Sequence, residues 1–320
     1  IVIDTRDGTV YHEANADQRL HPASLTKMMT LYVAFDAIER SRMDLDRRAT
    51  VSAHAAATGG ATLHLNVGDQ MRLSDLITAT AIMSANDAAV ALAEAVSGSE
   101  QAFVARMNDT AARMGLTGTR YLNVHGLTED GHLSTARDVA TLGRYLFFDF
   151  PEFYAMFSQI SAKIGTRDVA HTNRRFLGAY GGADGIKTGY TRAAGYNLAA
   201  SARRGEKHLI VVLFGAESSA VRAAAVAGMM NAGFDSAPEQ GPIRHPAPPG
   251  LSPANRTTGP LLAQLGGVGG FGAGSVLASG PKARSAGAVS LPDRDLLGPE
   301  TRARRPRPGG IGLTMFVRSE

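Results

Sequence analysis

Residues 21–35 read HPASLTKMMTLYVAF, and the architecture of the chain follows from this segment. From Ser24 to about Ile38 the sequence predicts a helix whose apolar residues leave almost no polar face. A helix that is apolar on every side is buried, so we expect it to lie in the middle of a core. Lys27 is its one basic residue, and the ammonium group would have to be buried with the helix.

Strands and further helices are predicted on both sides of this central helix. The predicted strands are Val2–Asp4, Thr9–Tyr11, Tyr196–Ala202 and Leu209–Gly215. The predicted helices are Ser74–Met83, Asp87–Val96, one capped by Ser99 that runs to Met114, one capped by Ser134 that runs to Leu146, and Ala220–Ala232. Strands at both ends and helices between them indicate an α+β fold with an antiparallel sheet packed against helices.

The composition changes abruptly near residue 237. Twelve of the 14 prolines lie in residues 237–320, followed by a glycine-rich run at 266–274. Such a segment buries too little apolar surface to offset its conformational entropy. We therefore predict a catalytic domain at 1–236 and a Pro/Gly/Arg-rich, largely disordered extension at 237–320.

Charge and residue usage exclude several classes of function. Residues 1–236 carry 23 Lys/Arg and 24 Asp/Glu, which gives no support to nucleic-acid binding, whereas residues 237–320 carry 10 and 5. The basic cluster Arg302–Arg307 suits peripheral contact with anionic wall polymer or membrane lipid, although a solvated run of charge is the simpler interpretation. The sequence has no cysteine and no His-Glu-x-x-His pair, so we predict no metal and no other cofactor. No apolar run is long enough to span a bilayer, and the opening Ile1-Val2-Ile3 suggests that an export signal has been removed.

Ser24 and Lys27 have the spacing of a nucleophile and its base. Three residues apart on a helix, they lie on one face, and burial should lower the pKa of the lysine until its neutral amine can take the serine proton. The Ser-x-x-Lys pattern alone decides little, because Ser279–Lys282 repeats it in the extension. An N-cap serine followed by a surface lysine would explain Ser24 and Lys27 equally well in isolation.

Two further motifs follow along the chain. Ser84-Ala85-Asn86 connects two predicted helices, where the hydroxyl could relay a proton and the amide could hold a substrate carbonyl, unless either side chain merely caps the next helix. Lys187-Thr188-Gly189 lies on a predicted edge strand, where its cation, its hydroxyl and its backbone N–H groups could bind an anion or an oxyanion. Gly189 would let a substrate backbone approach closely. Together the three motifs predict serine acyl-transfer chemistry.

The three motifs, in this order, are those of penicillin-binding proteins and class A β-lactamases. The chain resembles the low-molecular-mass penicillin-binding proteins, the D-alanyl-D-alanine carboxypeptidases of serine peptidase family S11. The similarity covers about residues 1–236, and the segments that carry it are 21–27, 84–89, 123–127, 134–138 and 184–191. The resemblance implies a β-lactamase/transpeptidase-like fold with a helical subdomain.

The resemblance also implies an activity and a role for each motif. Ser24 would attack the penultimate D-Ala carbonyl of a peptidoglycan stem peptide and release D-alanine, and β-lactam antibiotics would act as covalent inhibitors. Lys27 would be the base, Ser84 the proton relay and Asn86 a holder of substrate. The implied binding residues are Lys187, Thr188, Gly189, Tyr190 and Arg222, with Lys187, Thr188 and Arg222 facing the terminal carboxylate and the N–H groups of Ser24 and Tyr190 forming the oxyanion hole. The enzyme would be exported and would work on the periplasmic or cell-wall side of the bacterial inner membrane.

Three alternatives stay open at the level of sequence. A β-lactamase shares the motifs, but no Glu-x-x-Leu-Asn segment is present to activate a deacylating water. A D,D-endopeptidase that cuts cross-links would carry the same residues, and an inactive wall-binding scaffold would not need them. Two departures from the family pattern are the absence of a β-rich second domain signature in residues 237–320 and the paired arginines Arg174 and Arg175.

Overall fold

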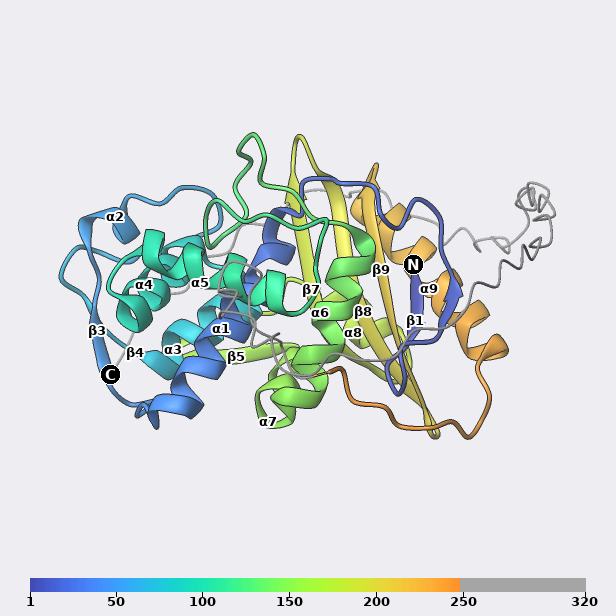
Figure 1. Cartoon of the computed structure of the whole chain (residues 1–320). Coiled ribbons are helices and arrows are strands. Elements are labelled where there is room, and N and C mark those ends of the chain that lie inside the picture. Colours follow the sequence, from blue (N-terminus) through green and yellow to red (C-terminus); the bar gives the residue numbers. More distant parts are fainter. Residues whose placement is uncertain (248–320) are drawn as a thin grey trace, which may run out of the picture. The chain divides into compact units, whose positions relative to one another are not determined.

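The structure is a computed structural model that describes residues 1–247. The strands are β1 Val2–Asp4, β2 Val10–His12, β3 Arg48–Thr50, β4 Gln70–Arg72, β5 Ser161–Ile164, β6 Arg167–Ala170, β7 Ala183–Thr191, β8 Gly195–Arg204 and β9 Lys207–Ala216. The helices are α1 Thr26–Ser41, α2 Ala53–Ala56, α3 Leu73–Thr78, α4 Asn86–Ser97, α5 Glu100–Arg113, α6 Ala136–Asp149, α7 Pro151–Tyr154, α8 Arg174–Ala179 and α9 Ser219–Ser236. Figure 1 shows the sheet at one side of this region and the helical block at the other.

Five strands form one antiparallel sheet in the order β2-β1-β9-β8-β7. The first and last parts of the described chain meet in it, because β1 pairs with β9, with Val2 opposite Val211. The predicted strands Val2–Asp4 and Thr9–Tyr11 are confirmed as β1 and β2, the second beginning one residue later; they pair as a hairpin, and Gly8 in its turn has a φ of 84°. The predicted edge position of residues 187–189 is also confirmed, since β7 ends the sheet.

Helices cover both faces of the sheet. On one face α9 packs Val226, Met230 and Phe234 against apolar residues of β1, β8 and β9. On the other face the alternate residues of the same strands, such as Ala199 and Ile210, join the main core together with α1 and α6. The fold is therefore a layered α+β arrangement, as the order of elements predicted.

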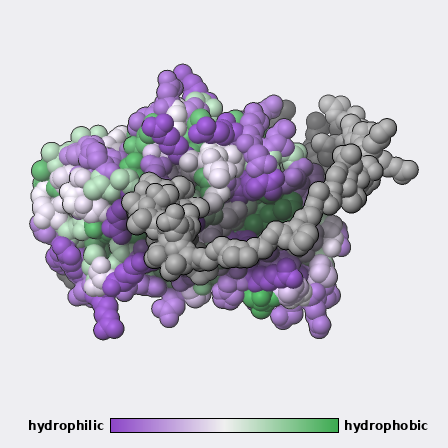
Figure 2. Space-filling model, viewed as in Figure 1, coloured by the Kyte–Doolittle hydropathy of each residue, from purple (hydrophilic) through white to green (hydrophobic). Residues whose placement is uncertain are grey.

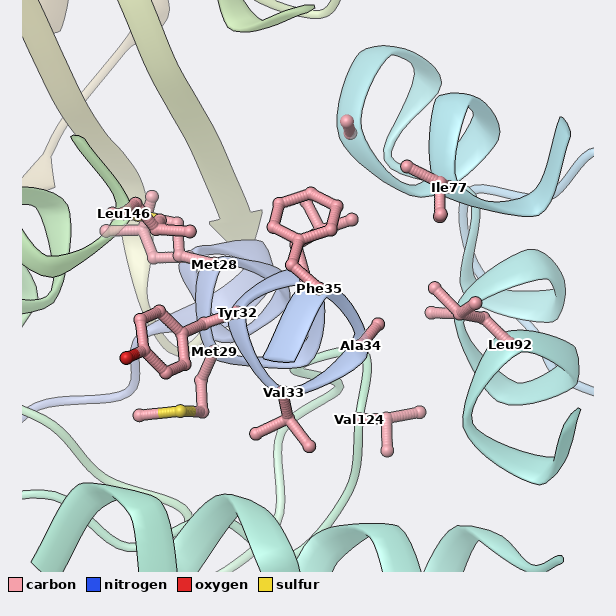
Figure 3. Close-up of a cluster of buried hydrophobic side chains, with 14 of the residues drawn as sticks. Met28, Met29, Tyr32, Val33, Ala34, Phe35, Ile77, Leu92, Val124 and Leu146 are labelled. Carbon is pink, nitrogen blue, oxygen red and sulfur yellow. The ribbon is translucent and has the colours of Figure 1, made fainter. Parts of the chain in front are cut away.

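Helix α1 lies in the middle of the main core, as its composition predicted. Its apolar side chains leave the helix in several directions and pack in the main core, with Val33 and Ala34 pointing away from Met28 and Tyr32 (Figure 3). Residues from Thr26 to Phe35 are without exception buried. Lys27 is buried with them and has no exposed surface.

Several predicted helix boundaries are wrong in detail, and the last helix, for example, ends at Ser236 where Ala232 was predicted. The central helix starts at Thr26, and Ser24 lies in a 3₁₀ turn, Ala23–Leu25, in front of it. The predicted helix 74–83 splits into α3 and a π-helical segment, Ala79–Met83. Helix α6 is capped by Thr135, whose Oγ1 accepts a hydrogen bond from the Asp138 N–H, whereas the Ser134 hydroxyl pairs with Thr119.

Residues 237–247 lie along the body of the domain. The Arg6 guanidinium donates hydrogen bonds to the carbonyls of Pro238 and Glu239, and the Tyr145 hydroxyl donates to the Ala247 carbonyl. The division of the chain at residue 237 stays a prediction, as does disorder in the extension. Ser279–Lys282 and the basic cluster Arg302–Arg307 lie outside the described residues.

Many hydrophilic residues lie on the face of the described domain that Figure 2 shows. Figure 2 shows hydrophilic residues over most of the visible face, with apolar residues in small separate areas. The large apolar side chains that are exposed come from scattered positions, including Val67, Ile160 and Tyr190. Within residues 1–247 we find no helix that has both the length and the apolar character needed to cross a membrane.

Candidate active site

Ser24 and Lys27 face each other at the start of α1. The Lys27 Nζ lies 3.2 Å from the Ser24 Oγ, 2.6 Å from the Asn86 Oδ1 and 2.8 Å from the His125 carbonyl oxygen. A neutral amine can donate its two hydrogens to the two carbonyl-type oxygens, which leaves its lone pair directed at the serine hydroxyl. Ser24 itself is only partly buried and can be reached from outside.

Burial favours the neutral form of Lys27. Desolvation lowers the pKa of Lys27 well below 10.5, and the positive charge of Lys187 lowers it further, against a smaller opposing effect of Asp87. No carboxylate within the described region forms an ion pair with Lys27. The amine is therefore held ready to accept a proton at neutral pH.

Ser84 and Asn86 reach the same site from the connection between the π-helical segment and α4. Neither side chain caps α4, so the simple capping explanation of this motif is wrong. The Asn86 amide instead joins Lys27 to the Gly59 carbonyl, to which its Nδ2 donates at 2.7 Å. Ser84 adopts a left-handed backbone conformation with φ 65°, which is uncommon outside glycine and typical of constrained functional positions.

Lys187 and Thr188 enter the site from the edge strand β7. The Lys187 Nζ donates to the Ser84 Oγ at 2.8 Å and to the Thr188 carbonyl at 3.1 Å. Lys187 has no exposed surface, and burial followed by the nearby charge of Arg222 lowers its pKa to about 7. Lys187 therefore holds Ser84 in place and can give up a proton near neutral pH.

Gly189 and Tyr190 continue β7 past the nucleophile. A Cβ on Gly189 would lie 2.9 Å from the Pro22 carbonyl oxygen and 3.1 Å from the Ser24 nitrogen, so the close approach that needs this glycine is made by the protein's own backbone. The Tyr190 side chain is 55% exposed and packs on Tyr196. Strand β7 and the 3₁₀ turn Ala23–Leu25 are thus held in contact. The Tyr190 backbone lies on the strand side of this contact and the Ser24 backbone on the turn side.

Arg222 lies in the first turn of α9, beside the same edge of the sheet. Its Nη1 donates to the Asn197 carbonyl at 3.3 Å, and its guanidinium carbon lies 6.0 Å from the centre of the Tyr196 ring. Asn197 pairs with Gly189 in the sheet, which brings the arginine next to β7. Arg222 is therefore a half-buried cation at the Lys187 end of the site.

The loop Asn123–Leu127 completes the site, and sequence reasoning gave it no role. Its His125 carbonyl binds Lys27, and its Gly126 has a φ of 90° and lies against Ala23. The Asn123 Oδ1 accepts from the Gly126 N–H and fixes the turn. The only signal in the sequence is the Asn-Val-His-Gly-Leu string, which does not reveal that the group that binds Lys27 is a backbone carbonyl oxygen.

The fold and the site define a class, the serine acyl-transferases of the penicillin-binding type, with a β-lactamase/transpeptidase-like fold. Within that class the match is specific. The family model for D-alanyl-D-alanine carboxypeptidases, peptidase S11, matches residues 1–218. The chain belongs to this family.

Individual relatives agree with the family. D-alanyl-D-alanine carboxypeptidase DacC of Escherichia coli is 42% identical over 228 residues, which cover 69% of this chain and 57% of DacC. The chain thus spans less than three-fifths of that relative. The crystal structure of penicillin-binding protein 6B from Escherichia coli has 36% identity and a TM-score of 0.69, covering 73% of this chain and 76% of that one. Penicillin-binding protein D2 from Listeria monocytogenes, in its ampicillin-bound form, has 29% identity and a TM-score of 0.67, covering 73% and 95%.

Proposed function

We propose that this protein is a serine D,D-carboxypeptidase that removes the terminal D-alanine from peptidoglycan stem peptides through an acyl-enzyme. The observation that carries the proposal is the Lys27 amine, buried and without an ion pair among the described residues, 3.2 Å from the Ser24 hydroxyl. Membership of the carboxypeptidase family supports the choice of substrate.

In the acylation step the Ser24 Oγ forms a bond to the penultimate D-Ala carbonyl carbon. The hydroxyl proton passes to the Lys27 Nζ, and the carbonyl oxygen becomes an oxyanion. The Thr188 carbonyl accepts a hydrogen bond from Lys187 and so points away from the neighbouring strand β8. Backbone groups two residues apart on a strand point to the same side, so the Tyr190 N–H also points away from β8. That N–H and the Ser24 N–H are the proposed oxyanion donors.

The carbon–nitrogen bond then breaks and D-alanine leaves. Ser84 gives its proton to the leaving nitrogen and takes one from Lys187, 2.8 Å away. In deacylation a water attacks the ester carbonyl, its proton returns through Ser84 to Lys187, and Lys27 gives its proton back to Ser24. Thr188, Lys187 and Arg222 bind the terminal carboxylate, and Gly189 sets the distance between β7 and Ser24.

The proposed function implies which molecules the protein binds and on which side of the membrane it acts. Peptidoglycan stem peptides are the substrates and β-lactam antibiotics the covalent inhibitors, as ampicillin is bound in the Listeria protein. Since peptidoglycan lies outside the cytoplasm, the enzyme would act there. Peripheral contact through the basic extension is a separate proposal about residues beyond the described ones.

Product analysis tests the function. From a pentapeptide stem that ends in D-Ala-D-Ala we expect free D-alanine and a tetrapeptide, measured by chromatography. Cross-linked peptide dimers cut without any release of D-alanine from the pentapeptide would assign the protein to the endopeptidases instead. Rapid turnover of penicillin, with no accumulating acyl-enzyme, would indicate a β-lactamase.

The pH dependence of kcat/KM for D-alanine release should show a plateau that ends near pH 7. Because burial and the charge of Lys187 lower the pKa of Lys27 well below 10.5, its amine loses its proton at a lower pH than a free lysine does, and once it is neutral a further rise in pH brings no gain. Above about pH 7 Lys187 loses its proton, and the substrate carboxylate is bound less well. Arg222→Gln removes a positive neighbour of Lys187, so the alkaline limb should move to higher pH. A rate that climbs steadily to pH 10 would contradict both assignments.

A further inference from the structure

The carbonyl that binds Lys27 belongs to a loop, so its place depends on what holds the loop. The Lys27 Nζ donates to the His125 carbonyl at 2.8 Å. The carbonyl of the preceding residue, Val124, accepts a hydrogen bond from the Thr30 hydroxyl at 2.6 Å. Thr30 lies on α1 three residues after Lys27, so one side of Val124 is tied to the helix that carries the base. The position of Val124 therefore sets the place of the His125 carbonyl.

Glu100 holds the other side of Val124. It is the first residue of α5 and is 8% exposed. Its Oε1 accepts a hydrogen bond from the Val124 N–H at 3.1 Å, and its Oε2 lies 2.6 Å from the His54 Nε2. Burying a carboxylate is costly unless hydrogen bonds compensate it, so these two contacts fix where the carboxylate lies. Val124 is thus clamped between α5 and α1.

The His125 side chain also faces Glu100. The His125 Nδ1 accepts a hydrogen bond from the Leu127 N–H at 3.1 Å, so the neutral ring carries its proton on Nε2. That Nε2 lies 3.8 Å from the Glu100 Oε1, which is too long for a hydrogen bond but brings an N–H dipole toward a carboxylate. Burial, followed by the charge of Lys27, lowers the pKa of His125 to about 3, so the ring is neutral near pH 7. Glu100 therefore adjoins both the side chain of His125 and the peptide in front of it.

We propose that Glu100 is a positioning residue, which fixes the His125 carbonyl against the amine of Lys27. The carbonyl takes one hydrogen of the neutral amine, whose lone pair then stays directed at the Ser24 hydroxyl. This inference rests on the proposed function, because it requires Lys27 to take the Ser24 proton. Glu100 supplies an acceptor atom at a fixed place rather than a charge, since burial and the charges of other residues shift the pKa of Lys27.

Two variants separate position from charge. Glu100→Gln removes the charge but keeps the length and an acceptor oxygen for the Val124 N–H, and its amide nitrogen can donate to the His54 Nε2. We expect it to be acylated by fluorescent penicillin within about twofold of the normal rate. Glu100→Asp keeps the charge but is shorter by one methylene, about 1.5 Å. It should be acylated about tenfold more slowly, because small misplacements of a catalytic group are costly. Aspartate suits the first turn of a helix, so this variant should fold.

A second background and a matched control exclude a general loosening of the fold. In Lys27→Met, which lacks the group to be positioned, Glu100→Asp should slow acylation no further, whereas a loosened fold would slow it in both backgrounds. The control is Asp138→Ala, which removes another buried carboxylate from the first turn of a helix. Asp138 is 7% exposed and accepts from the Gly118 N–H at 2.9 Å, in a loop that does not touch Lys27. This control should lower the thermal midpoint and still be acylated at the normal rate.

The outcomes distinguish this inference from the proposed function. Equal rates for Glu100→Gln and Glu100→Asp, or a loss in Glu100→Asp that persists in the Lys27→Met background, would overturn the role of Glu100 alone. Normal acylation of Lys27→Met, or no acylation of the unaltered protein, would overturn the acylation step of the proposed function and this inference with it.

Discussion

Penicillin is expected to acylate the variant Lys27→Met about 10³- to 10⁴-fold more slowly than the unaltered protein. Methionine keeps the length and burial of the side chain but has no lone pair of comparable basicity, so the Ser24 hydroxyl loses its proton acceptor. The distance of 3.2 Å between the Lys27 Nζ and the Ser24 Oγ makes a direct transfer feasible. The rate is measured with a fluorescent penicillin by following the labelled protein over time.

The two residues should act as one unit. Ser24→Ala should abolish labelling, and the double variant should be no worse than Ser24→Ala, because a base without its nucleophile contributes nothing. Lys163→Met, an exposed lysine on β5, is the matched control and should label at the normal rate. Labelling of Lys27→Met at more than a tenth of the normal rate would mean that another group takes the proton.

The loss of rate should not come from unfolding. Removing the amine leaves the Asn86 Oδ1 and the His125 carbonyl without a donor, which costs about 1–3 kcal/mol for each group. Relief from burying an ionisable group offsets this cost, since the lowered pKa of Lys27 shows that the folded protein disfavours its charge. We therefore expect the thermal midpoint of Lys27→Met to lie within a few degrees of normal, measured by circular dichroism.

Much of the fold was predictable because its signals are local. The apolar sequence of 24–38 predicted a buried helix, and with it the burial of Lys27 and the direction of its pKa shift. The strand signals on either side of Gly8, and those of 196–202 and 209–215, predicted two of the strand pairs of the sheet, β1 with β2 and β8 with β9, whereas the pairing of β1 with β9 was not predicted. The order of the three motifs then predicted which residues would meet, although they lie more than 160 positions apart at the extremes.

Other parts of the site were not predictable because they depend on backbone positions. The acceptor for Lys27 is the His125 carbonyl, and a carbonyl oxygen is common to every residue, so no residue type marks it. The left-handed conformation of Ser84 follows the π-helical segment, whose sequence suits an ordinary helix. Gly189 was expected to make room for substrate, whereas its close neighbours are the backbone atoms of Pro22 and Ser24.

Gly126→Ala should be strongly destabilising, with a loss of about 4 kcal/mol in the free energy of unfolding. A Cβ at this position would overlap the carbonyl oxygen and carbon of Ala23 and lie 2.8 Å from the Thr26 Oγ1. Backbone cannot rotate aside as a flexible side chain does, so the loop and the 3₁₀ turn must separate. The φ of 90° adds strain for any residue with a Cβ.

The same separation should reduce activity, because the loop carries the His125 carbonyl that holds Lys27 and the turn carries Ser24. A displacement of about 1 Å between nucleophile and base costs about 100-fold in rate. Gly131→Ala is the matched control: its φ is 87°, but a Cβ there would meet only the Leu122 Cδ1, at 3.9 Å. The control bears the backbone strain alone, about 1–2 kcal/mol, and should acylate normally. Equal losses of stability in urea unfolding for the two variants would show that the contact with Ala23 does not constrain the site.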